Sequence, residues 1–158
     1  MATPITYEQL NVLNAMYAQC IDDDRLEHWP DFFLQDCLYK ITNAENHRQG
    51  MEAGIVYADS KGMLQDRVSA LREANVYERQ SYRHIVSMPV MGEAAQGRVS
   101  VETSFMVVRI MRGGKSDLFA TGKYVDQVVQ DASGALKFAE RIVICDSISI
   151  DTLLAIPL

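Results

Sequence analysis

The sequence predicts an α+β fold in which helices near the start of the chain pack on a long antiparallel sheet. Two observations predict it. Apolar residues recur at helical spacing in the first half, whereas from Tyr82 onward they alternate with a period of two. Short turns, two of them containing glycine, join the long apolar runs of the second half, which is typical of an antiparallel meander. Helices followed by strands place the helices on one face of the sheet.

The first helix is expected to begin after Thr6. Thr6 and Gln9 form the T-x-x-Q pattern of a capping box, and apolar residues follow at helical spacing as far as Ile21. Three aspartates at 22–24 then oppose the helix macrodipole, so the helix should end there.

The next segment is expected to be short and mixed. One of the three aspartates should cap a short helix over 25–29, which Pro30 should end or kink. A short alternating strand is expected over 37–41, followed by a polar loop over 43–50 and a second short strand over 55–57.

A third helix is expected behind Ser60, whose hydroxyl can cap it. Its apolar face should consist of Met63, Leu64, Val68 and Leu71.

The second half should form a sheet of at least four antiparallel strands. The expected strands are 83–90, 99–111, 118–130 and 136–145, with turns at 112–115 and 131–134. In the first turn, Gly113 and Gly114 are expected to supply positive φ. Met106, Val108 and Ile110 lie on the second face of the 99–111 strand, so both faces of that end should be covered.

Long strands twist and coil, and helices on the concave side would turn such a sheet into a cone. This is the cystatin-like or NTF2-like arrangement, expected here as a single domain over residues 1–158. Such a cone can hold a small ligand, or side chains can fill it while the outer sheet face becomes an interface. The fold alone does not choose between these functions.

The composition excludes several functional classes. The 158 residues carry a net charge of −6, which disfavours nucleic-acid binding. No apolar run approaches the roughly 20 residues of a membrane span, and the start of the chain has no signal-peptide pattern. We therefore expect a cytoplasmic protein.

Groups that could bind a metal or a cofactor are scarce. The three cysteines, Cys20, Cys37 and Cys145, are scattered and are expected to be reduced, buried thiols. No C-x-H or C-x-x-H pair, H-x-x-x-H spacing, glycine-rich nucleotide motif or G-x-S-x-G elbow occurs. We expect no metal or cofactor on this chain.

Acid–base chemistry inside the cone remains possible. A carboxylate beside a histidine or tyrosine in a dry pocket can move a proton next to a carbonyl or drive a dehydration. This leaves open a stand-alone NTF2-like isomerase or dehydratase, or a binding protein without catalysis. The candidate residues are Asp22, Asp36, Tyr39, Tyr57, His84 and Asp126.

Structural roles compete with these functional ones. His84 can simply bond to its neighbours or to a partner subunit, and Trp29, Phe32, Phe33 and Tyr39 can form a plug between helix and sheet. The apolar tail 152–158 should dock on this chain or on a neighbour, because exposing it to water is costly.

Several segments, in this order, resemble the small (β) subunits of Rieske-type aromatic-ring-hydroxylating dioxygenases. The resemblance covers essentially the whole chain, and 53–60 and 71–79 are particularly similar to members that oxidise terephthalate. The other segments that carry it are 29–33, Asp36 with Tyr39, 63–67, 82–85 and 145–147.

The resemblance implies an oxidoreductase subunit without a catalytic residue of its own. In this family the large (α) subunit carries the Rieske [2Fe–2S] cluster, the mononuclear iron and the substrate pocket. Three small subunits form a trimeric base beneath three large ones, and the implied substrate is an aromatic carboxylate such as terephthalate. Trp29, Arg67, Arg83 and His84 are then expected at subunit contacts or in the core beneath them.

Overall fold

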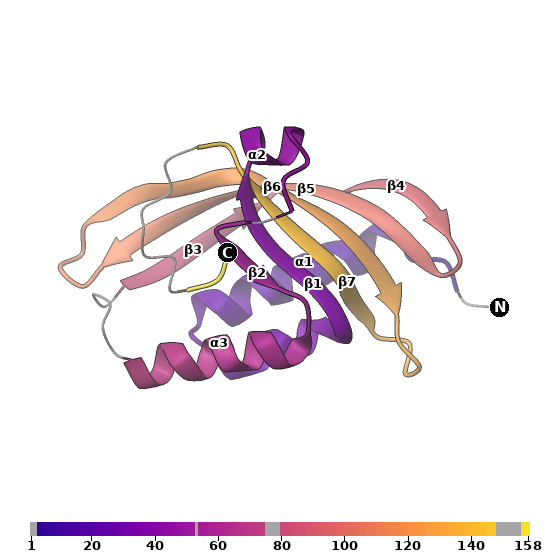
Figure 1. The fold of residues 1–158 in the computed structure, drawn as a ribbon, viewed down its shortest axis with the longest axis horizontal. Coiled ribbons are helices and arrows are strands. Elements are labelled where there is room, and N and C mark those ends of the chain that lie inside the picture. Colours follow the sequence, from indigo (N-terminus) through magenta and orange to yellow (C-terminus); the bar gives the residue numbers. More distant parts are fainter. Residues whose placement is uncertain (1–2, 53, 75–79, 148–155) are drawn as a thin grey trace.

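Figure 1 shows a computed structural model that describes residues 3–52, 54–74, 80–147 and 156–158. Its elements in chain order are α1 (Tyr7–Asp22), the 3₁₀ helix η1 (Leu26–Phe32), β1 (Phe33–Asn43), α2 (Ala44–Arg48), β2 (Val56–Ala58), α3 (Lys61–Ala74), β3 (Gln80–Val86), β4 (Val90–Ala95), β5 (Arg98–Met111), β6 (Ser116–Gln130) and β7 (Leu136–Cys145).

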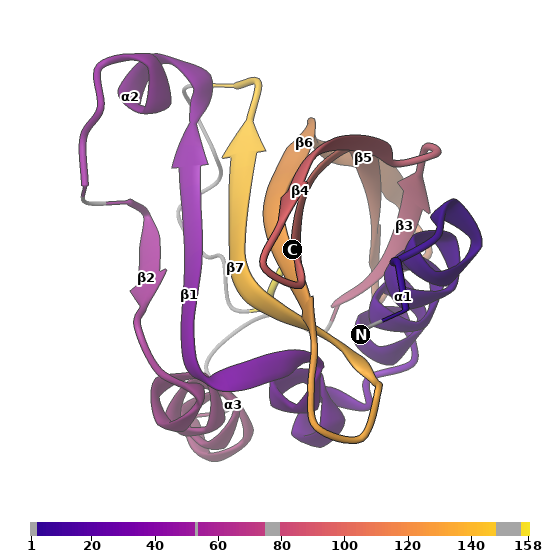
Figure 2. The same ribbon diagram turned by 90° about the vertical axis from the view of Figure 1, so that its right-hand side faces the viewer.

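The strands form one strongly curved sheet in the order β2-β1-β7-β6-β5-β3, and β4 also pairs with β5. In Figure 2, β5 and β6 curve over toward β3, and α1 lies beside β3. The helix α3 packs against η1 and β1. The predicted α+β cone with helices on a curved sheet is therefore confirmed. The sheet is mixed rather than purely antiparallel, because β1 and β7 run parallel.

The first helix is the one that the sequence predicts. Thr6 Oγ1 accepts a hydrogen bond from the Gln9 amide at 3.2 Å, and Gln9 Oε1 accepts one from the Thr6 amide at 2.9 Å. The helix ends at Asp22. The predicted aspartate cap of the next helix is wrong, since Arg25 precedes η1 without a capping side chain. The Asp24 carboxylate instead accepts a hydrogen bond from Arg72 at 2.9 Å.

From β1 to β2 the predicted strands are present, but their bounds differ from the predicted ones. The strand predicted over 37–41 extends to Phe33–Asn43. The predicted loop 43–50 contains the short helix α2, which the Asn43 side chain caps by accepting from the Asn46 amide at 2.8 Å. The strand predicted over 55–57 lies one residue further along the chain.

Ser60 caps α3 as predicted, because its hydroxyl oxygen accepts a hydrogen bond from the Met63 amide at 3.2 Å. Leu64, Val68 and Leu71 form the buried face. Met63 was predicted on that face but is 41% exposed.

The strand predicted over 83–90 is two strands. Both β3 and β4 pair with β5, and Pro89 lies between them, because proline cannot donate to a sheet ladder. The turns at 112–115 and 131–134 are confirmed, although of Gly113 and Gly114 only Gly114 has positive φ. The second face of β5 is not covered within the described chain, since Met106 is 38% exposed.

The last three residues, 156–158, dock on this chain, with Ile156 and Leu158 buried. The rest of the predicted apolar tail, 152–155, lies outside the described residues. None of the helices among the described residues is both long and apolar enough to cross a membrane.

Candidate functional site

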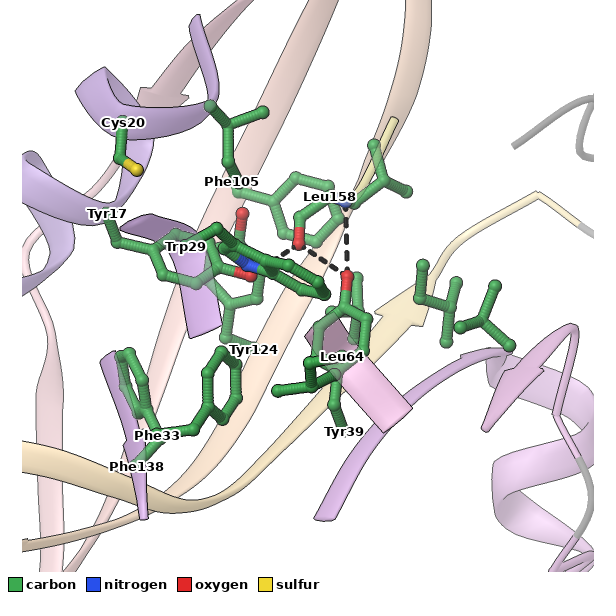
Figure 3. Packing of buried hydrophobic residues seen from close by; sticks show 14 of the residues in the cluster. Tyr17, Cys20, Trp29, Phe33, Tyr39, Leu64, Phe105, Tyr124, Phe138 and Leu158 are labelled. Atoms are coloured by element: carbon green, nitrogen blue, oxygen red, sulfur yellow. Dashed lines mark hydrogen bonds between the residues drawn. The ribbon is translucent and has the colours of Figure 1, made fainter. Parts of the chain in front are cut away.

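Aromatic side chains fill the interior of the cone (Figure 3). Tyr17 of α1 meets Phe33, Tyr124 and Phe138 edge-on, with ring centroids 5.7–6.3 Å apart. Trp29 of η1 stands edge-on to Tyr39 of β1 at 5.1 Å. All six of these aromatic residues are buried, so side chains from the helices and from the sheet pack this interior.

A charged pair lies buried among these rings. Arg141 of β7 and Asp126 of β6 are partners in the strand register, and the guanidinium donates to both carboxylate oxygens at 2.9 and 2.8 Å. Arg141 also donates to Asn14 Oδ1 at 2.6 Å and lies 3.9 Å above the rings of Tyr124 and Phe138. Burial raises the pKa of Asp126, and the neighbouring guanidinium opposes that rise. Because this carboxylate is bound in a bidentate pair, it is not a free general base.

The main-chain oxygen of Leu158 is the acceptor for two tyrosines. The hydroxyls of Tyr17 and Tyr39 both donate to it at 2.8 Å, as the dashed lines in Figure 3 show. The Leu158 amide donates to the Tyr39 oxygen at 3.2 Å. Burial raises the pKa of both tyrosines, so their hydroxyls remain neutral donors near neutral pH.

A second buried polar pair joins α1 to β3. The Asp22 carboxylate accepts from the His84 main-chain amide at 2.9 Å, and its other oxygen lies 2.6 Å from His84 Nδ1. The side chains of Asp22 and His84 are almost fully buried. The arrangement anchors the end of the helix to the sheet.

We expect Asp22→Ala to lower the free energy of unfolding by about 2 kcal/mol, because it leaves a buried amide and a buried ring nitrogen of His84 without their acceptor. Urea denaturation followed by circular dichroism measures this. The neighbouring change Asp23→Ala is the control, since it removes only an exposed ion pair and should cost less than about 0.5 kcal/mol. Equal losses for the two variants would contradict an anchoring role.

The structure does not bring the predicted pocket residues together. Asp36 and Tyr57 are exposed, Tyr39 is in the core, and His84 pairs with Asp22 away from them. No group of three or more His, Cys, Asp or Glu side chains among the described residues could hold a metal ion.

The residues predicted at subunit contacts lie in different environments. Trp29 and His84 are buried, Arg67 is half-buried, and Arg83 is exposed on β3. Contact of these residues with a partner stays a prediction.

No pattern in the sequence predicts the roles that Asn14 and Tyr17 have in this core. A signal existed for Arg141, because it occupies an inward position in the alternation of β7, where an apolar residue is usual.

The outward face of β3, β5 and β6 carries a row of apolar side chains. Ile85 is opposite Met106 in the β3–β5 register, and Val108 is opposite Leu118 in the β5–β6 register. Ile85 and Leu118 are 53% and 60% exposed. We call Ile85, Met106, Val108 and Leu118 the outer apolar face. An apolar groove lies along α1, lined by Val12, Leu13, Met16 and Leu136 with Glu8 and Gln9.

The sequence of the chain identifies its family. A family model described as the ring hydroxylating beta subunit matches residues 17–152. The chain belongs to this family. Two curated relatives are β subunits 1 and 2 of the terminal oxygenase component of terephthalate 1,2-dioxygenase from Comamonas sp. They are 49% and 50% identical over 150 residues, which cover 95% of this chain and 97% of each relative.

A third relative is the small subunit of anthranilate 1,2-dioxygenase from Burkholderia cepacia, 38% identical over 97% of this chain and 94% of its own. Among solved structures, a β subunit assigned to an aromatic-ring-hydroxylating dioxygenase of Novosphingobium aromaticivorans has a TM-score of 0.88 and 39% identity, with 96% of both chains covered. The β subunit of benzoate 1,2-dioxygenase from Burkholderia mallei has a TM-score of 0.75 at 12% identity over 91% of this chain and 93% of its own, which shows a shared fold.

These comparisons confirm the resemblance drawn from the sequence. The chain is a β subunit of an aromatic-ring-hydroxylating dioxygenase, and as part of a multicomponent oxygenase it has a large α subunit as its partner. Nothing in the comparisons or in the packed cone favours the alternative of a stand-alone isomerase or dehydratase.

Proposed function

We propose that this chain is the cofactor-free small subunit of an oxygenase that hydroxylates an aromatic carboxylate, with terephthalate as the first candidate. The observation that carries this is the identity of about half of all residues to two terephthalate dioxygenase β subunits over almost their whole length. Anthranilate, the substrate named for the third relative, is also an aromatic carboxylate. The common chemistry is therefore a ring that carries a carboxylate.

We further propose that the Rieske cluster and the mononuclear iron belong to the large subunit. The chemistry of the three cysteines supports this. Burial raises the pKa of Cys37 to about 11 and that of Cys145 to about 12, whereas metals bind thiolates. Three free, buried thiols also fit a reducing, cytoplasmic compartment.

The proposed assembly contains three large and three small subunits, with the small subunits in contact through their outer apolar faces. Exposed, contiguous apolar side chains on a sheet usually mark an interaction surface. Arg83 lies opposite Val108 in the β3–β5 register and is exposed, so it can contribute an ion pair at the edge of this interface.

Co-expression of the chain with its large subunit tests the proposal. We expect the two chains to purify in equal amounts, with iron and acid-labile sulfide present in the complex and lacking from the small subunit purified alone. Iron bound stoichiometrically to the lone chain would overturn the assignment of the cofactors. Oxygen uptake by the complex, supplied with electrons, should respond to terephthalate and not to toluene, which lacks the carboxylate. A response to toluene alone would overturn the substrate class.

Met106→Arg should abolish self-association of the small subunit, because it places a charge in the middle of the outer apolar face. Sedimentation velocity measures this, with a trimer expected for the unmodified chain and a monomer for the variant.

Val12→Arg is the matched control, since it puts the same charge on an exposed apolar position of α1, away from this face. We expect it to leave the trimer intact. A trimer that survives Met106→Arg, or one that only Val12→Arg disrupts, would contradict the proposed interface.

A further inference from the structure

The segment 156–158 lies inside the molecule in the way that a bound ligand does, rather than as part of a helix or strand. It belongs to no helix or strand, yet Leu158 is completely buried within the aromatic core of the cone. Figure 3 shows its backbone meeting Tyr39 among the buried rings. The surrounding side chains come from α1, η1, β1, α3 and β5, so the site is built by elements distant in sequence.

The polar part of this position is made of two donors that converge on one acceptor. The Tyr17 and Tyr39 hydroxyls, from α1 and β1, both reach the Leu158 main-chain oxygen at 2.8 Å. A carbonyl oxygen has two lone pairs, so the two donors satisfy it fully. Both tyrosines are almost completely buried, and burying hydroxyls without an acceptor is costly. The two tyrosines therefore favour any group that places an acceptor oxygen between their hydroxyls.

The remainder of the position is apolar and shaped by rings. Trp29, Phe105 and Leu64 belong to the same buried cluster as the Leu158 side chain. Two guanidinium groups act on the tyrosine pair: Arg141 lies 4.4 Å from the Tyr17 ring and is bound to Asp126, and the charge of Arg67 opposes the rise that burial causes in the pKa of Tyr39. An occupant thus needs an apolar body of about the size of a leucine side chain and one oxygen acceptor at its end.

We infer that the cone contains a binding site for small molecules with an apolar body and a terminal carbonyl or carboxylate oxygen, and that residues 156–158 are its resident occupant. Removal of the segment leaves the two tyrosine donors and the ring-lined space for a ligand. The tyrosine pair of this site shares no residue with the outer apolar face.

The test uses a chain shortened after residue 155, with 4-methylpentanoate and its amide as probes. Both carry the leucine-like body and an acceptor oxygen. The matched control compound, 4-methylpentylamine, carries the same body but ends in a donor cation that cannot accept a hydrogen bond. Trp29 is the only tryptophan and lies 5.1 Å from Tyr39, so its fluorescence reports occupancy directly.

We expect saturable binding of both acceptor probes to the shortened chain, and no binding of the amine or of any probe to the full chain. At saturating probe the melting temperature should rise by about 5 °C or more. In the shortened chain, Tyr39→Phe should weaken binding about tenfold, because it removes one of the two donors. Equal binding of amine and acid, or no effect of Tyr39→Phe, would overturn the inference.

The shortened chain can also lose stability, so refolding from urea provides a second readout. The tripeptide Ile-Pro-Leu carries the two buried side chains of the missing segment and the Leu158 amide and oxygen that the tyrosines bind, so it should restore the refolding yield if that segment is a separable occupant. Restoration by the tripeptide alone, without binding of the small acceptors, would show a purely structural segment and overturn the inference. The inference would also be overturned if 4-methylpentanoate, its amide and the tripeptide all failed to restore folding.

Discussion

Replacing Arg141 with methionine should lower the free energy of unfolding by about 4 kcal/mol, which is a large part of the stability of a protein of this size. The variant removes one partner of a completely buried ion pair and leaves the Asp126 carboxylate among aromatic rings without its cation. It also removes the donor to Asn14 and the cation above Tyr124 and Phe138. Urea denaturation at neutral pH measures the loss.

The loss should depend on pH with a definite sign. Burial already raises the pKa of Asp126, and without Arg141 nothing opposes that rise. A carboxyl whose pKa is higher in the folded state binds more protons there, so its contribution to stability falls as the pH increases. We therefore expect a small deficit in Arg141→Met below about pH 4, where Asp126 is protonated in both states, and a growing deficit toward neutral pH.

Two controls separate this effect from the simple loss of a salt bridge. Arg109→Met breaks another bidentate arginine–aspartate pair between neighbouring strands, the one with Asp117, which is partly exposed. It should lower the free energy of unfolding by less than about 1 kcal/mol. The double change Arg141→Met with Asp126→Leu should recover most of the stability, since no buried charge remains. Similar losses for Arg141→Met and Arg109→Met would contradict the role of burial.

Local patterns in the sequence predict those parts of the fold that depend on neighbouring residues. The capping box fixes the start of α1, and the turn at 131–134 fixes the end of β6 and the start of β7. Pairing between distant strands is different, because it depends on packing that no local pattern records. The parallel alignment of β1 with β7 and the division of 83–90 into β3 and β4 belong to this class.

The polar pairs of the candidate site could not be predicted either, because their partners are distant in the sequence. Asp22, His84 and Asp126 are recognisable in the sequence as candidate acid–base residues, but 62 positions separate Asp22 from His84. Only the register of β6 with β7 places Asp126 opposite Arg141, and only the return of 156–158 places Leu158 between two tyrosines. The family could be recognised nevertheless, because it depends on the order of short segments rather than on their contacts.

Gly122→Ala should lower the free energy of unfolding by about 3 kcal/mol, although it adds a single methyl group. Gly122 lies in β6, opposite Cys145 of β7 and Phe105 of β5. A Cβ atom there would overlap the Ile144 carbonyl oxygen and lie 3.0 Å from the Cys145 Cα. Both obstacles are backbone atoms of the neighbouring strand, so no side chain can rotate away, and β6 and β7 must separate. Thermal and urea denaturation measure the loss.

Gly92→Ala is the matched control, because it makes the same change in a strand of the same sheet. A Cβ atom at Gly92 would lie 3.5 Å from the Ser100 Cβ, which is an ordinary contact, and the cost should be below about 1 kcal/mol. If the close approach at Gly122 also sets the curvature of the sheet, Gly122→Ala should weaken trimer formation in sedimentation velocity, because the outer apolar face includes residues of both β5 and β6. A folded Gly122→Ala variant with unchanged stability would contradict the close strand approach from which this prediction follows.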